Sequence, residues 1–111
     1  MAYEMRDQDG ATIVEVMGEL DVATATELTD YLSGLLKKFP RKVVLDLTGV
    51  GYMASSGLAM LVASLKKSRE MRVPFGICGI SPVVRHSIEV AALDEVLPIY
   101  KDVSDALRKL S

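Results

Sequence analysis

The sequence predicts an α/β fold: a mixed, mainly parallel sheet of about five strands covered by about four helices. Two observations on patterning support it. The spacing of apolar residues changes repeatedly between an alternating and a helical period, and short β-branched runs stand between the helical stretches. The third is size, because 111 residues, of which 50% are hydrophobic and 25% charged, suffice for one core but not for two. We therefore expect residues 1–111 to form one domain.

The first third of the chain predicts a hairpin followed by a helix. The Asp-Gly pair at 9–10 is typical of a tight hairpin turn, and alternation over 12–17 predicts the strand that follows it. A helical apolar stripe comes next, formed by Ala25, Leu28, Leu32, Leu35 and Leu36. Thr24 and Glu27 have capping-box spacing, with Asp21 just upstream, so we expect the helix to begin here.

The middle of the chain predicts a second strand and helix. "KVVLDL" at 42–47 is a short and almost continuous apolar run, which is typical of a strand covered on both faces. A helical stripe follows, formed by Leu58, Leu61, Val62 and Leu65. Ser55 and Ser56 in "GYMASSGLAML" lie where the strand gives way to this helix. Loops at the carboxyl ends of parallel strands are where such sheets carry their sites, so this junction is the candidate site.

The last third predicts two more strands, each followed by a helix. "VPFGICGI" at 73–80 is a buried strand, and Ser81 caps a helix that has Pro82 in its first position. "VLPIY" at 96–100 is a short strand whose internal proline predicts a sheet edge, and Asp102 caps the final helix. The predicted order is β-β-α-β-α-β-α-β-α.

Charge and composition exclude several classes of partner. The formal net charge is −2 with no basic run, so we expect no direct binding of nucleic acid. The chain shows neither an export signal nor a stretch apolar enough for membrane insertion. Its single cysteine, Cys78, cannot form an internal disulfide, which fits a cytoplasmic protein.

The sequence gives little support to an enzyme. His86, the only histidine, lies in the expected third helix, and M-A-S-S-G lacks the G-x-S-x-G pattern of a serine nucleophile. One histidine and one cysteine on separate elements cannot form a metal site, and no phosphate-binding glycine loop occurs. Cys78 lies in an apolar strand and is expected to be a small buried hydrophobe. We expect no cofactor.

The two serines allow a structural and a functional interpretation. As a helix cap, one serine oxygen accepts a free backbone N–H and contributes about 1 kcal/mol. That explains one of Ser55 and Ser56, but it does not explain Gly57, since glycine in a helix costs up to about 1 kcal/mol relative to alanine. A glycine in the first turn suggests that something approaches the backbone there, such as the active site of another protein.

Two segments resemble a known family. "GELDVATATEL" (18–28) and "VVLDLTGVGYMASSGLAMLV" (43–62) are similar to the corresponding segments of STAS domains, and in particular of bacterial anti-sigma factor antagonists. The similarity extends over nearly the whole chain, and the length and element order agree. It implies a STAS-like domain that works by binding other proteins.

The resemblance also implies a mechanism. In that family the first serine of the S-S-G triplet, here Ser55, is phosphorylated by a partner that is both serine kinase and anti-sigma factor. The unphosphorylated antagonist binds this partner, the phosphorylated one releases it, and a serine phosphatase restores the first state. The partner-binding residues carried over are Asp21, Ala54, Ser55, Ser56 and Gly57. For Asp21 the alternative is a purely structural helix cap.

One residue departs from the family pattern. The family usually has Asp before the phosphorylated serine, whereas this chain has Ala54. If that Asp orients the hydroxyl, phosphorylation here is expected to be slower, less specific or absent. The alternatives are therefore modification of Ser56, or a module that acts by binding alone, such as a soluble subunit of a lipid-transport ABC system. A nucleotide-binding role and an enzyme have less support.

Overall fold

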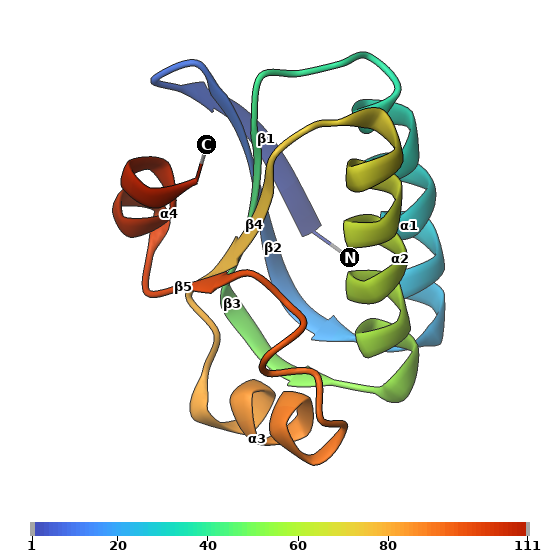
Figure 1. The fold of residues 1–111 in the computed structure, drawn as a ribbon. Helices are drawn as coiled ribbons and strands as arrows, with labels where there is room; N and C mark the ends of the chain where they lie inside the picture. The colour runs from blue at the N-terminus through green and yellow to red at the C-terminus, as the bar shows by residue number, and fades with distance from the viewer. Residues whose placement is uncertain (1, 111) are drawn as a thin grey trace.

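The computed structural model describes residues 2–110, and its elements follow the predicted order (Figure 1). The strands are β1 (Ala2–Gln8), β2 (Ala11–Leu20), β3 (Val43–Met53), β4 (Phe75–Cys78) and β5 (Ile99–Tyr100). The helices are α1 (Val22–Leu36), α2 (Ser55–Met71), α3 (Pro82–Val90) and α4 (Val103–Lys109). No helix among these residues is both long enough and apolar enough to span a bilayer.

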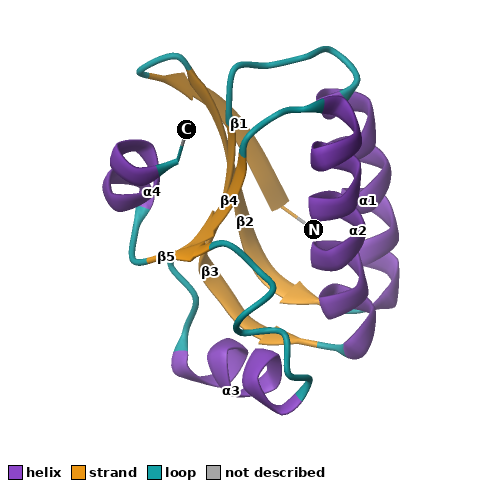
Figure 2. Ribbon diagram, viewed as in Figure 1, coloured by secondary structure: helices purple, strands orange, loops and turns teal. Residues whose placement is uncertain are grey.

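The five strands form one sheet in the order β1-β2-β3-β4-β5. β1 and β2 are antiparallel, and the remaining neighbours are parallel, so the sheet is mixed and mainly parallel as predicted. α1 and α2 lie side by side on one face, α4 lies on the other, and α3 lies near the carboxyl end of β3 (Figures 1 and 2). β5, which follows Pro98, forms a sheet edge, as its proline predicted.

Each face of the sheet has its own apolar cluster. The larger one lies beneath α1 and α2 and includes Leu28, Leu45 and Leu61, each with no exposed surface. α3 adds two buried residues, Val84 and Ile88, to this cluster. The smaller cluster lies beneath α4 and consists of Ala11, Ile13, Val44, Cys78, Ala106 and Leu110. The sheet is therefore packed on both faces, and the loops at its carboxyl end extend from this packed core.

The hairpin forms as the Asp-Gly pair predicted. Asp9 and Gly10 have φ angles of +51° and +80°, which a two-residue turn of this kind requires at both central positions. Gln8 pairs with Ala11 across the turn. This register places Ile13 on the α4 face and Val14 on the α1 face.

The capping box of α1 starts three residues earlier than the spacing of Thr24 and Glu27 predicted. Asp21, and not Thr24, is the N-cap: its carboxylate accepts the Thr24 N–H at 3.0 Å, while the Thr24 hydroxyl accepts the Asp21 N–H at 2.9 Å. Thr24 is thus the third residue of a reciprocal capping box. Glu27 has no part in this box. It could form one only if Thr24 were the N-cap, and the helix would then begin about one turn later than it does.

Other element boundaries also differ from the prediction. β3 continues to Met53 instead of ending at Leu47, because its pairing with β2 resumes after two register shifts. These shifts break the alternation over the glycine-rich residues 48–52, so no strand pattern is visible there. β4 is shorter than the predicted 73–80. Val62 does not belong to the buried stripe of α2, whose inward face is completed by Met60, Ser64 and Ser68.

Candidate functional site at the carboxyl end of β3

The two serines lie where β3 passes into α2. β3 ends at Met53, Ala54 is the N-cap, and α2 begins at Ser55. The Ala54 N–H donates to the Leu20 carbonyl at 2.9 Å, and this bond joins the junction to the end of β2. The junction is therefore held by two neighbouring strands, which fixes the direction in which α2 starts.

The interpretation of Ser55 or Ser56 as the helix cap is wrong. Ala54 has extended backbone, as a cap requires, but its side chain provides no hydrogen bond, and the first-turn bonds are those from Gly57 N and Leu58 N to the Ala54 carbonyl. Ser55 is exposed. The Ser56 Oγ is buried and has no hydrogen-bond partner among the described residues. A buried hydroxyl without a partner costs free energy, so Ser56 does not stabilise the start of α2 through a hydrogen bond.

Gly57 is required by internal packing. It is buried, and a Cβ at this position would lie 2.5 Å from Met53 Cγ and 3.2 Å from Leu20 Cβ. The expectation that Gly57 leaves the backbone open to a partner is therefore wrong, because the residue faces the ends of β2 and β3. Its absent side chain lets the first turn of α2 sit directly on the strands.

Asp21 lies at the same end of the sheet as Ser55. It follows Leu20, which pairs with Met53 across β2 and β3. Its side chain is exposed, and hydrogen bonds from the Thr24 backbone and hydroxyl lower the pKa of the carboxyl group from its ordinary value. The structural role predicted for Asp21 is thus present.

An open groove of about 450 Å³ separates the β3–α2 junction from α3. Its lining consists of Tyr52, Met53, Ala54, Ser55, Leu58, His86, Ser87, Val90 and Ala91. Val90 and Tyr52 are unusually exposed for apolar residues, at 73% and 50%. No Asp, Glu, Lys or Arg belongs to the lining, so the groove presents apolar surface with a few hydroxyls and one imidazole. Such a surface suits a protein segment better than a charged small molecule.

The sequence analysis did not predict the α3 side of this groove, and it assigned His86 to no site. A signal was available. β3 and β4 are parallel neighbours, so the helices that follow them start at the same edge of the sheet. His86 and Val90 are four residues apart on α3 and share a face of the helix.

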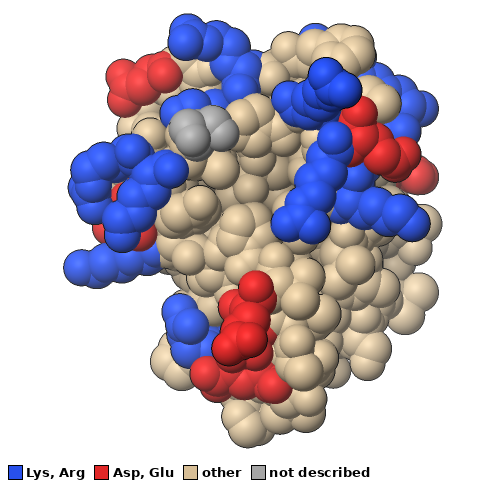
Figure 3. Space-filling model, in the orientation of Figure 1, with Lys and Arg blue, Asp and Glu red and all other residues tan. Residues whose placement is uncertain are grey.

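The charged side chains lie around the groove and not in it. α3 and the segment after it carry the exposed acids Glu89, Asp94 and Glu95. Figure 3 shows a cluster of acidic side chains in this lower part of the molecule, with a basic group beside it, while most of the Lys and Arg side chains in this view lie in the upper part. The surface between the acidic patch and the start of α2 is uncharged in the same view.

Neither a metal site nor a reactive thiol accompanies the groove. Among residues 2–110, no three His, Cys, Asp or Glu side chains are grouped so that they could hold a metal ion. Cys78 is fully buried in β4, and this burial, with Asp46 nearby, raises the pKa of its thiol to about 12. The predicted role of Cys78 as a buried hydrophobe is confirmed, since a thiol with such a pKa stays protonated at neutral pH.

Comparison with known proteins identifies relatives over most of the chain. The family model of the STAS domain matches residues 2–106. The anti-sigma-F factor antagonist RsfB of Mycobacterium tuberculosis is 30% identical over 101 residues, which cover 91% of this chain and 82% of that protein. The anti-sigma-B factor antagonist of Staphylococcus aureus is 31% identical over 96 residues, with 86% and 89% covered.

A solved structure agrees with these relatives. The crystal structure of an anti-sigma factor antagonist from Mycobacterium paratuberculosis superimposes with a TM-score of 0.86 at 32% identity, covering 96% of this chain and 91% of that one. The likeness includes the five-stranded mixed sheet and the four helices on which the groove is built. The chain therefore belongs to the STAS-domain family, and its relatives include anti-sigma factor antagonists.

Proposed function

We propose that this protein is a cytoplasmic anti-sigma factor antagonist that works as a switch between two binding states. In the unphosphorylated state it binds an anti-sigma factor with serine kinase activity, with the groove and the start of α2 as contact surface. Phosphorylation of Ser55 releases this partner, and a serine phosphatase restores the binding state. The protein itself catalyses no reaction in this cycle.

The difference in exposure between the two serines carries the proposal. Ser55 is exposed and lines the groove, whereas the Ser56 Oγ is buried. A kinase must reach the hydroxyl that it modifies, and this requirement supports Ser55 as the acceptor. Its position as the first residue of α2 suits a phosphate, because the free N–H groups of the first turn and the positive end of the helix dipole attract an anion.

The same geometry explains why phosphorylation would cause release. A phosphoserine carries nearly two negative charges at neutral pH. On the rim of a groove whose lining has no charged side chain, that charge would be buried without a cation when a partner docks. The fold tolerates the modification, while the contact surface does not.

A second candidate is a STAS module that binds without phosphorylation, such as a subunit of a lipid-transport ABC system. Ala54 favours it, because the residue before the phosphorylated serine is usually Asp in the antagonists that this chain resembles. In this case the groove would still be the contact surface, but Ser55 would be one of its polar contacts and not a switch.

One experiment separates the two candidates. The protein is incubated with ATP and a purified anti-sigma factor that has serine kinase activity, and the modified residue is mapped by mass spectrometry, with Ser55→Ala and Ser56→Ala as paired variants. We expect one phosphate on Ser55, lost in Ser55→Ala and kept in Ser56→Ala. Stable binding of the kinase with no phosphate on either serine would support the second candidate and contradict the switch.

A further inference from the structure

β1 leaves one edge of the sheet unpaired. It lies outermost in the strand order and, within residues 2–110, pairs only with β2. Thr12 donates its N–H to the Lys42 carbonyl on the β3 side, so its neighbour Ala11 directs its backbone groups toward Gln8 of β1. A two-residue turn with positive φ at both central positions joins such a pair, and every second residue of β1 from Gln8 therefore directs its N–H and C=O toward β2. The residues between them, Tyr3, Met5 and Asp7, direct their backbone groups outward. The edge therefore offers three residues ready for a further strand, whereas β5 at the other edge has only two residues in all.

Charge on this edge selects one way of pairing with a second copy. If two β1 strands pair antiparallel with Met5 opposite Met5, Glu4 of each copy lies opposite Arg6 of the other. Two other registers also let the outward backbone groups pair. The register centred on residue 4 places Glu4 opposite Glu4, and the register centred on residue 6 places Arg6 opposite Arg6. Opposite charges across a strand pair stabilise it and like charges destabilise it. The Met5-centred register is also one in which the outward backbone groups face each other.

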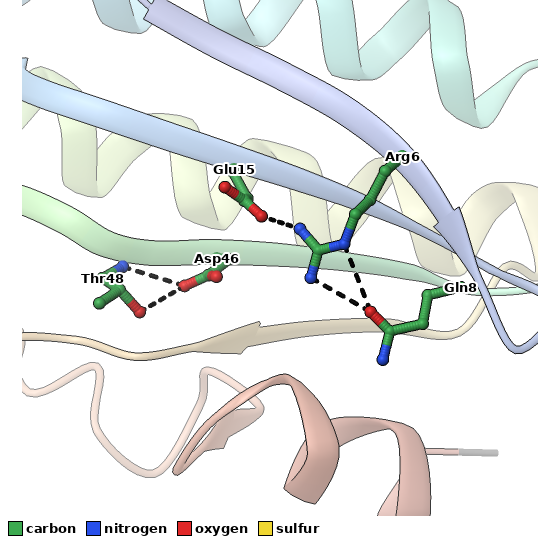
Figure 4. Close-up of polar contacts among 5 residues, drawn as sticks. All are labelled: Arg6, Gln8, Glu15, Asp46 and Thr48. Atoms are coloured by element: carbon green, nitrogen blue, oxygen red, sulfur yellow. Dashed lines mark hydrogen bonds and ion pairs between the residues drawn. The ribbon is translucent and has the colours of Figure 1, made fainter.

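Glu4 has no cationic partner in the part of the chain that the structure describes. It lies opposite Glu15 in the β1–β2 register and forms no ion pair among residues 2–110. Arg6 pairs with Glu15, and its guanidinium also donates to Gln8 Oε1 at 3.2 and 3.3 Å, on the α4 face of the sheet (Figure 4). A guanidinium has five N–H donors, so Arg6 can bridge Glu15 of its own chain and Glu4 of a second copy.

The opposite face of β1 adds an apolar surface at the same place. Met5 is 52% exposed and lies in an open groove of about 410 Å³ beside α1. The groove is lined by Met5, Asp30, Tyr31, Gly34, Leu35 and Lys38. In the Met5-centred pair the two α1 helices are antiparallel and about three strand spacings, or ~14 Å, apart. The two grooves face each other across that gap, and Asp30 of one copy lies toward Lys38, which follows the end of α1, in the other.

We propose that two copies of this chain associate through β1, forming one continuous sheet with the Met5 residues at the two-fold axis. The partner is a second copy because the edge is complementary to itself in both backbone and charge. The groove beside Ser55 lies at the carboxyl ends of β3 and β4 and takes no part in the contact. A dimer therefore presents two such grooves, and its formation depends neither on Ser55 nor on a kinase.

The test reverses the charge of Glu4 and of Arg6 in separate variants and measures dimerisation by sedimentation equilibrium. We expect the wild-type protein to dimerise, and Glu4→Arg and Arg6→Glu each to weaken dimerisation by about tenfold or more, because each dimer contains two of the affected pairs. An equimolar mixture of the two variants should dimerise again, since every contact is then between opposite charges. Glu70→Arg, an equal charge change on the exposed face of α2, serves as the control and should dimerise like wild type.

Hydrogen exchange gives a second readout that needs no variant. The amides of Tyr3, Met5 and Asp7 should exchange more slowly as the wild-type concentration rises, while amides on α3 should not change. A wild-type protein that stays monomeric up to about 1 mM overturns the proposal, since weaker association has no effect at cellular concentrations. A dimer that survives both charge reversals, or variants that fail to associate when mixed, would overturn it as well.

Discussion

The starts of α1 and α2 lie beside each other at one end of the sheet, yet they are built differently. At α1, Asp21 and Thr24 satisfy each other in a capping box. At α2, the cap is Ala54, which contributes no side-chain hydrogen bond. α3 and α4 resemble α1, because Ser81 and Asp102 cap them. The uncapped helix is thus the one whose first residue lines the groove, and its free N–H groups stay available to an anion.

The largest effect is expected from a negative charge at the start of α2. Ser55→Asp should leave the unfolding transition unchanged, because a carboxylate suits a helix N-terminus. It should weaken binding to the anti-sigma kinase on the order of a hundredfold, because the charge is desolvated at the contact without a cation. Isothermal titration calorimetry measures the affinity, and Ser55→Ala should bind at least as tightly as wild type.

Ser104→Asp is the matched control for this prediction. Ser104 is also an exposed serine in the first turn of a helix, but it lies in α4 on the other face of the sheet. This variant should bind the kinase with wild-type affinity. Equal loss in both variants would mean that overall charge, and not the position of Ser55, governs docking.

The second prediction compares one glycine in each helix. Gly57→Ala should destabilise the protein by about 1–3 kcal/mol, because the added Cβ would lie 2.5 Å from Met53 Cγ. Gly34→Ala in α1 should stabilise it by about 0.5–1 kcal/mol, since nothing lies within 4 Å of the new Cβ and alanine favours a helix. Urea unfolding of both variants at one protein concentration measures the difference. If Gly57→Ala is neutral, the first turn of α2 does not rest on the strands as described.

The contrast between the two helix starts could be predicted only in part. Local signals placed the hairpin at 9–10 and the caps of α3 and α4 correctly, because a turn or cap depends on residues close in sequence. The buried position of Gly57 depends on Leu20, and the groove depends on His86, each about 30 residues or more from the site. Periodicity within one segment carries no information about such contacts.

The same limit explains the errors at α1 and α2. Thr24 fits the capping-box pattern with either Asp21 or Glu27, and the hydrogen bonds to Asp21 decide between them. At α2, Ser55 and Ser56 are both residue types that commonly cap a helix, so the sequence alone favours either of them as the cap. Ala54 takes the cap position instead because β3 continues to Met53, through a register shift that the sequence does not reveal.

A third prediction fills the missing cap. Ala54 already has the extended backbone of an N-cap, with φ −77° and ψ 171°, so Asp at this position can accept an N–H of the first turn. Ala54→Asp should stabilise the protein by about 0.5–2 kcal/mol in thermal unfolding. Ala23→Asp, which adds the same charge at the second residue of α1, should have less effect because Asp21 already caps that helix. A neutral or destabilising Ala54→Asp would show that the start of α2 cannot accept a cap.

The smallest expected effect is on the stability of the protein at acidic pH. It distinguishes the start of α1, which has a titrating cap, from the start of α2, which has none. Hydrogen bonds from Thr24 hold the pKa of the Asp21 carboxyl below its ordinary value in the folded state. A lowered pKa means that the folded state favours the charged form, so the stabilisation is present at neutral pH and is lost as the pH falls below about 4. Asp21→Asn keeps a side-chain oxygen that can accept the Thr24 N–H, but it does not titrate.

We therefore expect Asp21→Asn to lose less stability than wild type between about pH 5 and pH 2, when urea midpoints are compared at each pH. At neutral pH the variant should remain folded, and any weakening of kinase binding there would assign Asp21 a contact beyond its cap. Ala54→Asp should behave in the opposite way and steepen the acid dependence, because it adds a titrating cap where none exists. If neither variant changes the slope, the carboxylates that govern acid unfolding lie elsewhere, for example at Asp105, whose pKa is also lowered, chiefly by the Lys101 N–H.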